Sequence, residues 1–129
     1  MKKSNPRKPT EAELSILRVL WERGPSTVRD VWQQLNPAQR TGYTTVLKLM
    51  QIMAEKRLVK RDESERSHVY EAALSQEQTQ RQVVSHLLER LFAGSSHKLV
   101  MQALASKKAT PAEVAAIRKL LDEMEGGAP

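Results

Sequence analysis

The chain has 129 residues, of which 40% are hydrophobic and 28% are charged, values typical of one globular domain or of a small domain with an appendage. It contains no cysteine, which excludes disulfide bonds, cysteine-ligated zinc or copper sites and cysteine nucleophiles. The longest apolar runs span only a few residues, so we expect a cytoplasmic protein with neither a signal peptide nor a membrane span.

Basic residues are concentrated in the first part of the chain. The formal net charge is +6. Residues 1–74 hold 14 Lys and Arg against 9 Asp and Glu, a net of +5, whereas residues 75–129 hold 7 against 6, a net of +1. Such a bias attracts nucleic acid or an anionic membrane surface, although basic residues also serve solubility alone.

Two helices are predicted before residue 40. Thr10 and Glu13 form the T-x-x-E pattern of a capping box, and the helix that begins there ends at Gly24-Pro25. Its apolar stripe consists of Leu14, Leu17, Val19, Leu20 and Trp21. A second helix starts around residues 27–30 and is expected to end at Asn36-Pro37. Its buried side consists of Val28, Val31, Trp32 and Leu35. Two short helices with a glycine-containing connection, followed by a third helix, are the pattern of a helix-turn-helix.

The stretch TGYTTVLKLMQIMAEKRLVKR at residues 41–61 predicts a third helix with two unlike faces. At 100° per residue, the apolar residues Val46, Leu49, Met50 and Met53 share one side, so we interpret the methionines as core. Base reading is assigned to the front of the opposite face, at Tyr43, Thr44, Thr45 and Lys48. Phosphate contacts are assigned to the residues around it, Arg40, Thr41, Gln51, Lys56 and Arg57. The alternative is a solvated polar face on a three-helix domain.

Residues 58–72 change to an alternating pattern, which is typical of a two-stranded hairpin with a polar turn at residues 63–67. Three helices followed by a hairpin form a winged helix-turn-helix, so the expected fold is mainly α with a small β-hairpin. Lys60, Arg61 and Arg66 are assigned to the DNA backbone. Because Glu63 and Glu65 at the tip would be repelled by phosphate, we expect the wing to flank the DNA.

The runs PTEAELSILRVLWERGPSTVRDVWQQL, TGYTTVLKLMQIMAEKRLVKR and HVYEAALS together resemble the penicillinase-repressor family, over roughly residues 9–125. This family includes the beta-lactamase, methicillin-resistance and copper-responsive repressors. The resemblance implies a dimeric bacterial repressor on a palindromic operator, with a recognition helix at residues 42–56 and operator contacts at Thr44, Thr45 and Lys48. Where the family usually has glycine, in E-K-G-L-V, this chain has Arg57, which must adopt a left-handed conformation or turn differently.

Residues 75–129 are predicted to form a helical dimerisation domain that follows a winged-helix domain at residues 1–74. A capping box at residues 75–78 begins a helix that Gly94 closes, a shorter helix covers residues 98–105, and a box at residues 110–113 begins a last helix. Three amphipathic helices in about 50 residues offer one another little surface, so burial against a second copy is favoured over packing on the first domain. The residues assigned to this interface are Leu87, Leu88, Leu91, Leu99, Val100, Ile117, Leu120, Leu121 and Met124.

The sequence contains no G-x-S-x-G, H-E-x-x-H or glycine-rich phosphate loop, and its three histidines lack the spacing of a metal site. We therefore expect no enzyme, no cofactor and no metal. The favoured function is a sequence-specific repressor of double-stranded DNA. The alternatives are a winged-helix module for protein interaction and, more remotely, double-stranded RNA binding.

The resemblance also bears on how the repressor is released. The copper-responsive branch uses a pair of C-terminal cysteines, which this chain lacks. The antibiotic-responsive branch is released by proteolysis at an Asn-Phe bond, which suggests a membrane sensor peptidase as a partner. The matching bond here, Gln102-Ala103, offers neither residue, so we place any cleavage between Phe92 and Lys108, where Gly94-Ser95-Ser96 interrupts the helices. A ligand in the tail is the alternative.

Overall fold

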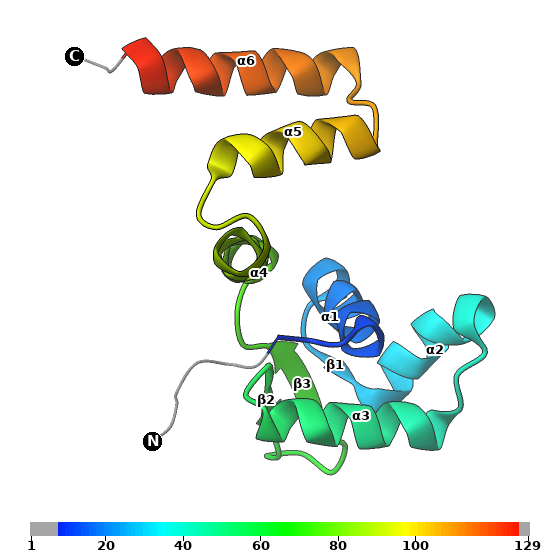
Figure 1. Ribbon diagram of the computed structural model, residues 1–129. Coiled ribbons are helices and arrows are strands. Elements are labelled where there is room, and N and C mark those ends of the chain that lie inside the picture. The colour runs from blue at the N-terminus through cyan, green and yellow to red at the C-terminus, as the bar shows by residue number, and fades with distance from the viewer. Residues whose placement is uncertain (1–7, 127–129) are drawn as a thin grey trace, which may run out of the picture. The chain divides into compact units, whose positions relative to one another are not determined.

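The computed structural model describes residues 8–126, so the basic residues among positions 1–7 lie outside the described residues (Figure 1). In chain order the elements are α1 (Glu11–Arg23), β1 (Ser26–Thr27), α2 (Val28–Gln39), α3 (Tyr43–Glu55), β2 (Val59–Asp62), β3 (Val69–Ala72), α4 (Gln76–Leu91), α5 (Ser96–Ser106) and α6 (Pro111–Gly126). The chain divides into two compact units, one ending at Val83 and the other beginning at Val84. This division falls inside α4, C-terminal to the boundary that we expected between residues 74 and 75.

The first unit is a winged helix-turn-helix, as the sequence predicted. Helices α1, α2 and α3 pack around one core with a small antiparallel sheet of order β1-β3-β2 (Figure 1). Strand β3 pairs with β2 in the register Val59 to Ala72 and with β1 in the register Ser26 to Tyr70. The sheet thus has one short strand more than the expected hairpin. The buried apolar residues are Ile16, Leu17, Leu20, Val28, Val31, Leu35, Val46, Met50, Met53, Leu58, Val59 and Tyr70.

The end of α2 corrects one prediction. Asn36-Pro37 was expected to end the helix, but α2 continues to Gln39, and Arg40 caps it in a left-handed conformation with φ of 51°. A proline inside a helix removes the hydrogen bond of its own missing N–H and crowds the carbonyl four residues earlier, but it leaves the bonds of the following residues possible. The carbonyl of Asn36 is still satisfied, because it accepts the N–H of Arg40 at 2.9 Å. The helix can therefore pass through Pro37 in its last turn, while Leu35 stays buried in the core.

The second unit leaves most of its large apolar residues exposed. Helix α4 is followed by Ala93 and Gly94 with positive φ angles of 49° and 81°, and α5 begins at Ser96, two residues before the expected start. Helices α5 and α6 run in opposite directions (Figure 1). Within residues 96–126, neither helix contains a buried residue. Among the described residues, none of the helices combines the length and apolarity needed to span a membrane.

Candidate nucleic-acid interface

Helix α3 separates a buried face from an exposed one, as its sequence predicted. Val46, Met50 and Met53 are fully buried against the core of the first unit. The residues assigned to base reading, Tyr43, Thr44, Thr45 and Lys48, are all exposed on the N-terminal half of the helix. Short hydroxyl and flexible amine side chains can approach base edges, because a major groove admits a helix with its side chains. The exposed side of α3 therefore has the composition of a recognition helix.

Trp32 of α2 fixes the place where α3 begins. Its indole Nε1 donates a hydrogen bond of 2.9 Å to the carbonyl of Thr41, in the connection between the two helices. Its ring also meets the ring of Tyr43 edge to face, with centroids 5.9 Å apart and planes at 83°. Sequence reasoning assigned Trp32 only to the core. The structure shows that it also contacts the ring of Tyr43, which stays 41% exposed.

A groove of about 520 Å³ lies between the start of α2, the exposed side of α3 and the wing formed by β2 and β3. Its lining includes two predicted cations, Arg61 and Arg66, and two residues that sequence reasoning missed, Arg29 and His68. Gln51 of α3 lines it as well. The signal for Arg29 was its place in the first turn of the second helix, which a helix-turn-helix directs towards the phosphate backbone. We call this feature the wing groove.

Arg61 of the wing lies beside α3 and interacts with Tyr70 and Glu63 of the same wing. A hydrogen bond with Tyr70 raises the pKa of the Arg61 guanidinium above its ordinary value, and Glu63 acts in the same direction. The Glu63 carboxylate lies 2.7 Å from Arg61 Nε. One of the two acidic residues at the wing tip is thus paired with a cation of the same wing, which reduces the repulsion that it would exert on phosphate.

The cations that flank α3 differ in exposure and in their partners. Arg40, Arg57 and Lys60 are exposed. Lys56 was expected among the phosphate contacts, but its Nζ lies 2.8 Å and 3.0 Å from the two carboxylate oxygens of Glu13, and only 23% of its side chain is exposed. The ammonium group of Lys56 is thus engaged with a buried carboxylate of the protein, unlike the exposed cations around it.

Arg57 settles a question that the sequence left open. It adopts the left-handed conformation, with φ of 67°, at the position where the resembling family usually has glycine. Its N–H donates to Ala54 O at 3.1 Å, and the N–H of Leu58 donates to Met53 O at 2.9 Å. These two bonds satisfy the last carbonyls of α3 and turn the chain into β2.

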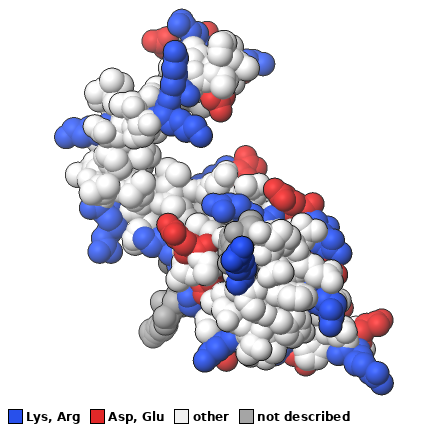
Figure 2. All heavy atoms as spheres, turned by 90° about the vertical axis from the view of Figure 1, so that its right-hand side faces the viewer, with Lys and Arg blue, Asp and Glu red and all other residues white. Residues whose placement is uncertain are grey.

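Charge is dispersed over one face of the larger unit. In Figure 2, Lys and Arg groups lie around the margin of an uncharged surface, with Asp and Glu groups between them. Acidic groups interspersed in this way cancel part of the long-range field over this face.

The second unit presents the apolar residues that were assigned to dimerisation. Leu87, Leu91, Val100, Leu120, Leu121 and Met124 are exposed by 38–71%. Leu88, Leu99 and Ile117 are half-buried. Further exposed apolar residues beside those nine are Val84, Met101, Leu104 and Val114. A groove of about 600 Å³ lies between α5 and α6, lined by Leu104, Ile117 and their neighbours.

A winged helix-turn-helix with an exposed polar recognition helix, bordered by arginines of α2 and the wing, defines a DNA-binding protein of the transcription-regulator class. The sequence matches the family described as penicillinase repressor over residues 9–123, and the chain belongs to that family. It is therefore a DNA-binding transcriptional repressor.

Individual proteins are similar to the chain along most of its length. Two proteins described as transcriptional regulator BlaI, from Mycobacterium tuberculosis strains CDC 1551 / Oshkosh and ATCC 25618 / H37Rv, are each 29% identical to it over 119 residues. These alignments cover 91% of this chain and 85% of each relative. The solved structure of BpsR from Bordetella bronchiseptica, described with the regulation of its DNA binding by 6-hydroxynicotinic acid, matches with a TM-score of 0.45 and 21% identity. That match covers 91% of this chain and 76% of BpsR.

Proposed function

We propose that this repressor acts in the cytoplasm as a homodimer that binds a palindromic operator, with α3 of each copy in a major groove. The observation that carries this proposal is the composition of the exposed side of α3. Its N-terminal half presents Tyr43, Thr44, Thr45 and Lys48, while its other side is locked into the core through Val46 and Met50. A helix held rigidly in this way can place side chains on base edges with little loss of conformational entropy.

Phosphate contacts come from the residues around α3. The wing groove supplies Arg29 from α2 together with Arg61 and Arg66 from the wing, and Lys60 is exposed on β2. Each cation that neutralises a phosphate releases counterions, so it strengthens binding to any DNA sequence and makes that binding sensitive to salt. Arg40, Arg57, Thr41 and Gln51 remain in this proposed set, whereas Lys56 is left out because of its pairing with Glu13.

The second unit supports the homodimer. Its large apolar residues are exposed in a single chain, and those in α6 share one side of the helix, with Ile117, Leu120, Leu121 and Met124 at helical spacing. Exposed apolar residues gathered on one side mark an interface, and twofold symmetry is the commonest way for identical chains to close one. The two recognition helices should then meet half-sites about one turn of DNA apart, roughly 34–36 Å, or a multiple of that.

The test compares two exposed lysines, Lys48 of α3 and Lys60 of β2, with different proposed roles. Operator fragments are first selected from genomic DNA, and fluorescence anisotropy then measures affinity for operator and for random DNA at several salt concentrations. Lys48→Ala should lower operator affinity by about 1–3 kcal/mol, with little change on random DNA. Lys60→Ala, the matched control, should weaken binding to operator and to random DNA equally. It should also reduce the salt slope, which is the slope of log affinity against log salt concentration, by about one unit.

Two results would contradict the proposal. Equal losses on operator and random DNA for Lys48→Ala would remove its base-reading role. A wild-type protein that binds no DNA at low salt would favour the module for protein interaction instead.

Release by proteolysis remains part of this proposal, with a membrane sensor peptidase as the partner. Gln102-Ala103 lies within α5, so a protease would have to unfold that helix locally before it could bind the bond. The connection between α4 and α5, around exposed Ala93 and Gly94, has no such requirement. Intact-mass spectrometry of the repressor from cells exposed to a cell-wall antibiotic should show cleavage between residues 92 and 108. An uncut chain alongside induced target genes would point to a ligand.

A further inference from the structure

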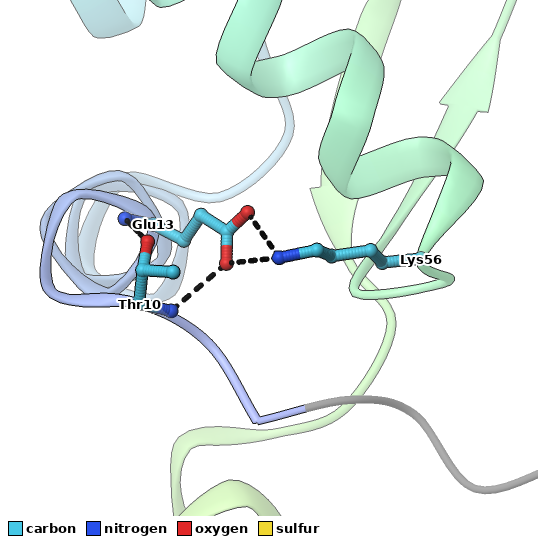
Figure 3. A network of polar contacts seen from close by, with 3 residues as sticks. All are labelled: Thr10, Glu13 and Lys56. Carbon is cyan, nitrogen blue, oxygen red and sulfur yellow. Dashed lines mark hydrogen bonds and ion pairs between the residues drawn. The ribbon is translucent and has the colours of Figure 1, made fainter.

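A buried ion pair joins the start of α1 to the end of α3 (Figure 3). Glu13 is only 2% exposed, and its carboxylate lies 2.8 Å and 3.0 Å from Lys56 Nζ. The same carboxylate accepts the backbone N–H of Thr10 at 2.9 Å, while the Thr10 hydroxyl accepts the N–H of Glu13 at 3.2 Å. The acidic residue of the α1 capping box is thus also the anchor for a lysine 43 positions further along the chain.

This arrangement is more than a surface ion pair. A buried carboxylate loses its hydration, so it is tolerated only where donors replace the water, and removal of one partner leaves the other uncompensated. Glu13 receives donors from both α1 and α3, and Lys56 is the residue that caps α3, where a positive charge also suits the negative end of the helix. The pair therefore couples the end of α3 to α1, a helix that contributes no residue to the lining of the wing groove.

The two ends of α3 are held by different contacts. Trp32 fixes its first turn through Thr41 and Tyr43, and Lys56 ties the residue after its last turn to α1. A helix of 13 residues is about 20 Å long, so a shift at one end changes the direction of the whole exposed face. Side chains that read bases have to be held within roughly half an ångström of their productive positions.

We propose that Lys56 is a positioning residue, which acts through Glu13 to set the angle at which α3 presents its base-reading side chains. This inference rests on the proposed operator reading by α3. The proposal gives Lys56 a different role from the exposed cations around it. Those cations are proposed to bind DNA phosphates, whereas Lys56 binds Glu13 and so holds the end of α3. Glu13, which is buried, serves the same purpose without any access to DNA.

The test uses the variants Glu13→Gln and Lys56→Met and the double variant that combines them. Glutamine keeps an oxygen for the N–H of Thr10 but removes the charge, and methionine keeps most of the length of the lysine stem. Each single variant should lower the ratio of operator affinity to random-DNA affinity roughly tenfold, the equivalent of about 1.4 kcal/mol, with an unchanged salt slope. The double variant should lose less than the two single losses combined, because no unpaired charge remains.

Hydrogen exchange in the absence of DNA gives an independent readout. The N–H groups of Lys56 and Leu58 close the end of α3 through Ile52 O and Met53 O, and both should exchange faster in the two single variants. Lys48→Ala is the matched control, since its side chain is exposed on the same helix, and it should leave this exchange unchanged. If Lys56→Met does not fold, the affinity ratio and the hydrogen exchange of Glu13→Gln alone test the proposal.

Three results would overturn the proposal. A Glu13→Gln variant that keeps the wild-type ratio, whatever its exchange rates, would show that the pair is structural only. A Lys56→Met variant that loses about one unit of salt slope equally on all DNA would identify a phosphate contact instead. If the wild-type protein itself shows no operator preference, the proposed function fails, and the exchange data then describe only how α3 is anchored.

Discussion

Arg57 holds a conformation that suits glycine better than any residue with a side chain. Its φ of 67° brings Cβ close to the following carbonyl, which costs on the order of 1 kcal/mol. Arg57→Gly should therefore raise the free energy of unfolding in urea by about 0.5 kcal/mol, after the greater freedom of glycine in the unfolded chain is taken into account. Arg57→Ala is the control, because it removes the charge but keeps the strain. An equal gain for alanine would show that the charge, not the backbone, is unfavourable.

Asp30 makes the stability of α2 depend on pH. The pKa of its carboxyl lies below the ordinary value, chiefly because the backbone N–H of Thr27 donates to it, and Arg23 at 3.3 Å acts in the same direction. A lowered pKa means that the folded state favours the charged form. The stabilisation of the fold by the Asp30 carboxylate is thus fully present above the pKa of the unfolded chain, about 3.9. It is lost as the pH falls through the lower pKa of the folded state.

The variant Asp30→Asn should be less stable than wild type by about 0.5 kcal/mol at pH 7, because asparagine can still accept the N–H of Thr27 but loses the negative charge in the first turn of α2. Urea unfolding between pH 6 and pH 3 measures the free energy of unfolding of both proteins. The difference between wild type and Asp30→Asn should become smaller towards pH 3. A difference that stays constant over this range would mean that the charge of Asp30 contributes nothing.

At the scale of elements, α3 begins differently from α1 and α2. Those helices start with threonine capping boxes, whereas the N-cap of α3 is Gly42, which provides no side-chain hydrogen bond. A Cβ at Gly42 would meet nothing within 4 Å, and its backbone is extended, so other residues fit there. The first N–H groups of α3 therefore lack a side-chain cap at the end that we propose for DNA contact.

Gly42→Ser and Gly42→Asp should both stabilise the fold by a few tenths of a kcal/mol, because each supplies a cap. Only aspartate should weaken DNA binding strongly, since its carboxylate competes with phosphate for the positive end of the helix. Thermal unfolding and anisotropy on the same samples separate the two effects. Equal binding by the two variants would place the start of α3 away from the DNA backbone.

At the scale of the whole molecule, the apolar side of α6 tests the homodimer. Leu120→Glu combined with Leu121→Glu should dissociate the dimer in light scattering, because two carboxylates would have to be buried without partners. The control combines Ala115→Glu with Lys119→Glu, which introduces the same groups on the opposite side of the same helix. The control should stay dimeric. A dimer that survives the leucine changes would locate the interface elsewhere.

Local patterns in the sequence determined most of the elements. The capping boxes at Thr10, Ser75 and Thr110 all form, because each depends only on residues three positions apart. Helical spacing likewise predicted the buried methionines of α3. The end of α2 was predicted wrongly because the carbonyl of Asn36 still finds a donor in the N–H of Arg40, so the helix continues past Pro37.

Only the tertiary structure decided which charged residues pair with other residues of the fold and which are exposed to solvent. In the sequence, Lys56 and Arg57 are adjacent cations of the same apparent kind, yet the fold pairs Lys56 with Glu13 and leaves Arg57 exposed. Arg29 and Arg66 are 37 residues apart in the chain but line one groove. Periodicity describes neighbours on a single helix or strand, whereas these contacts depend on how α1, α2, α3 and the wing pack around a shared core.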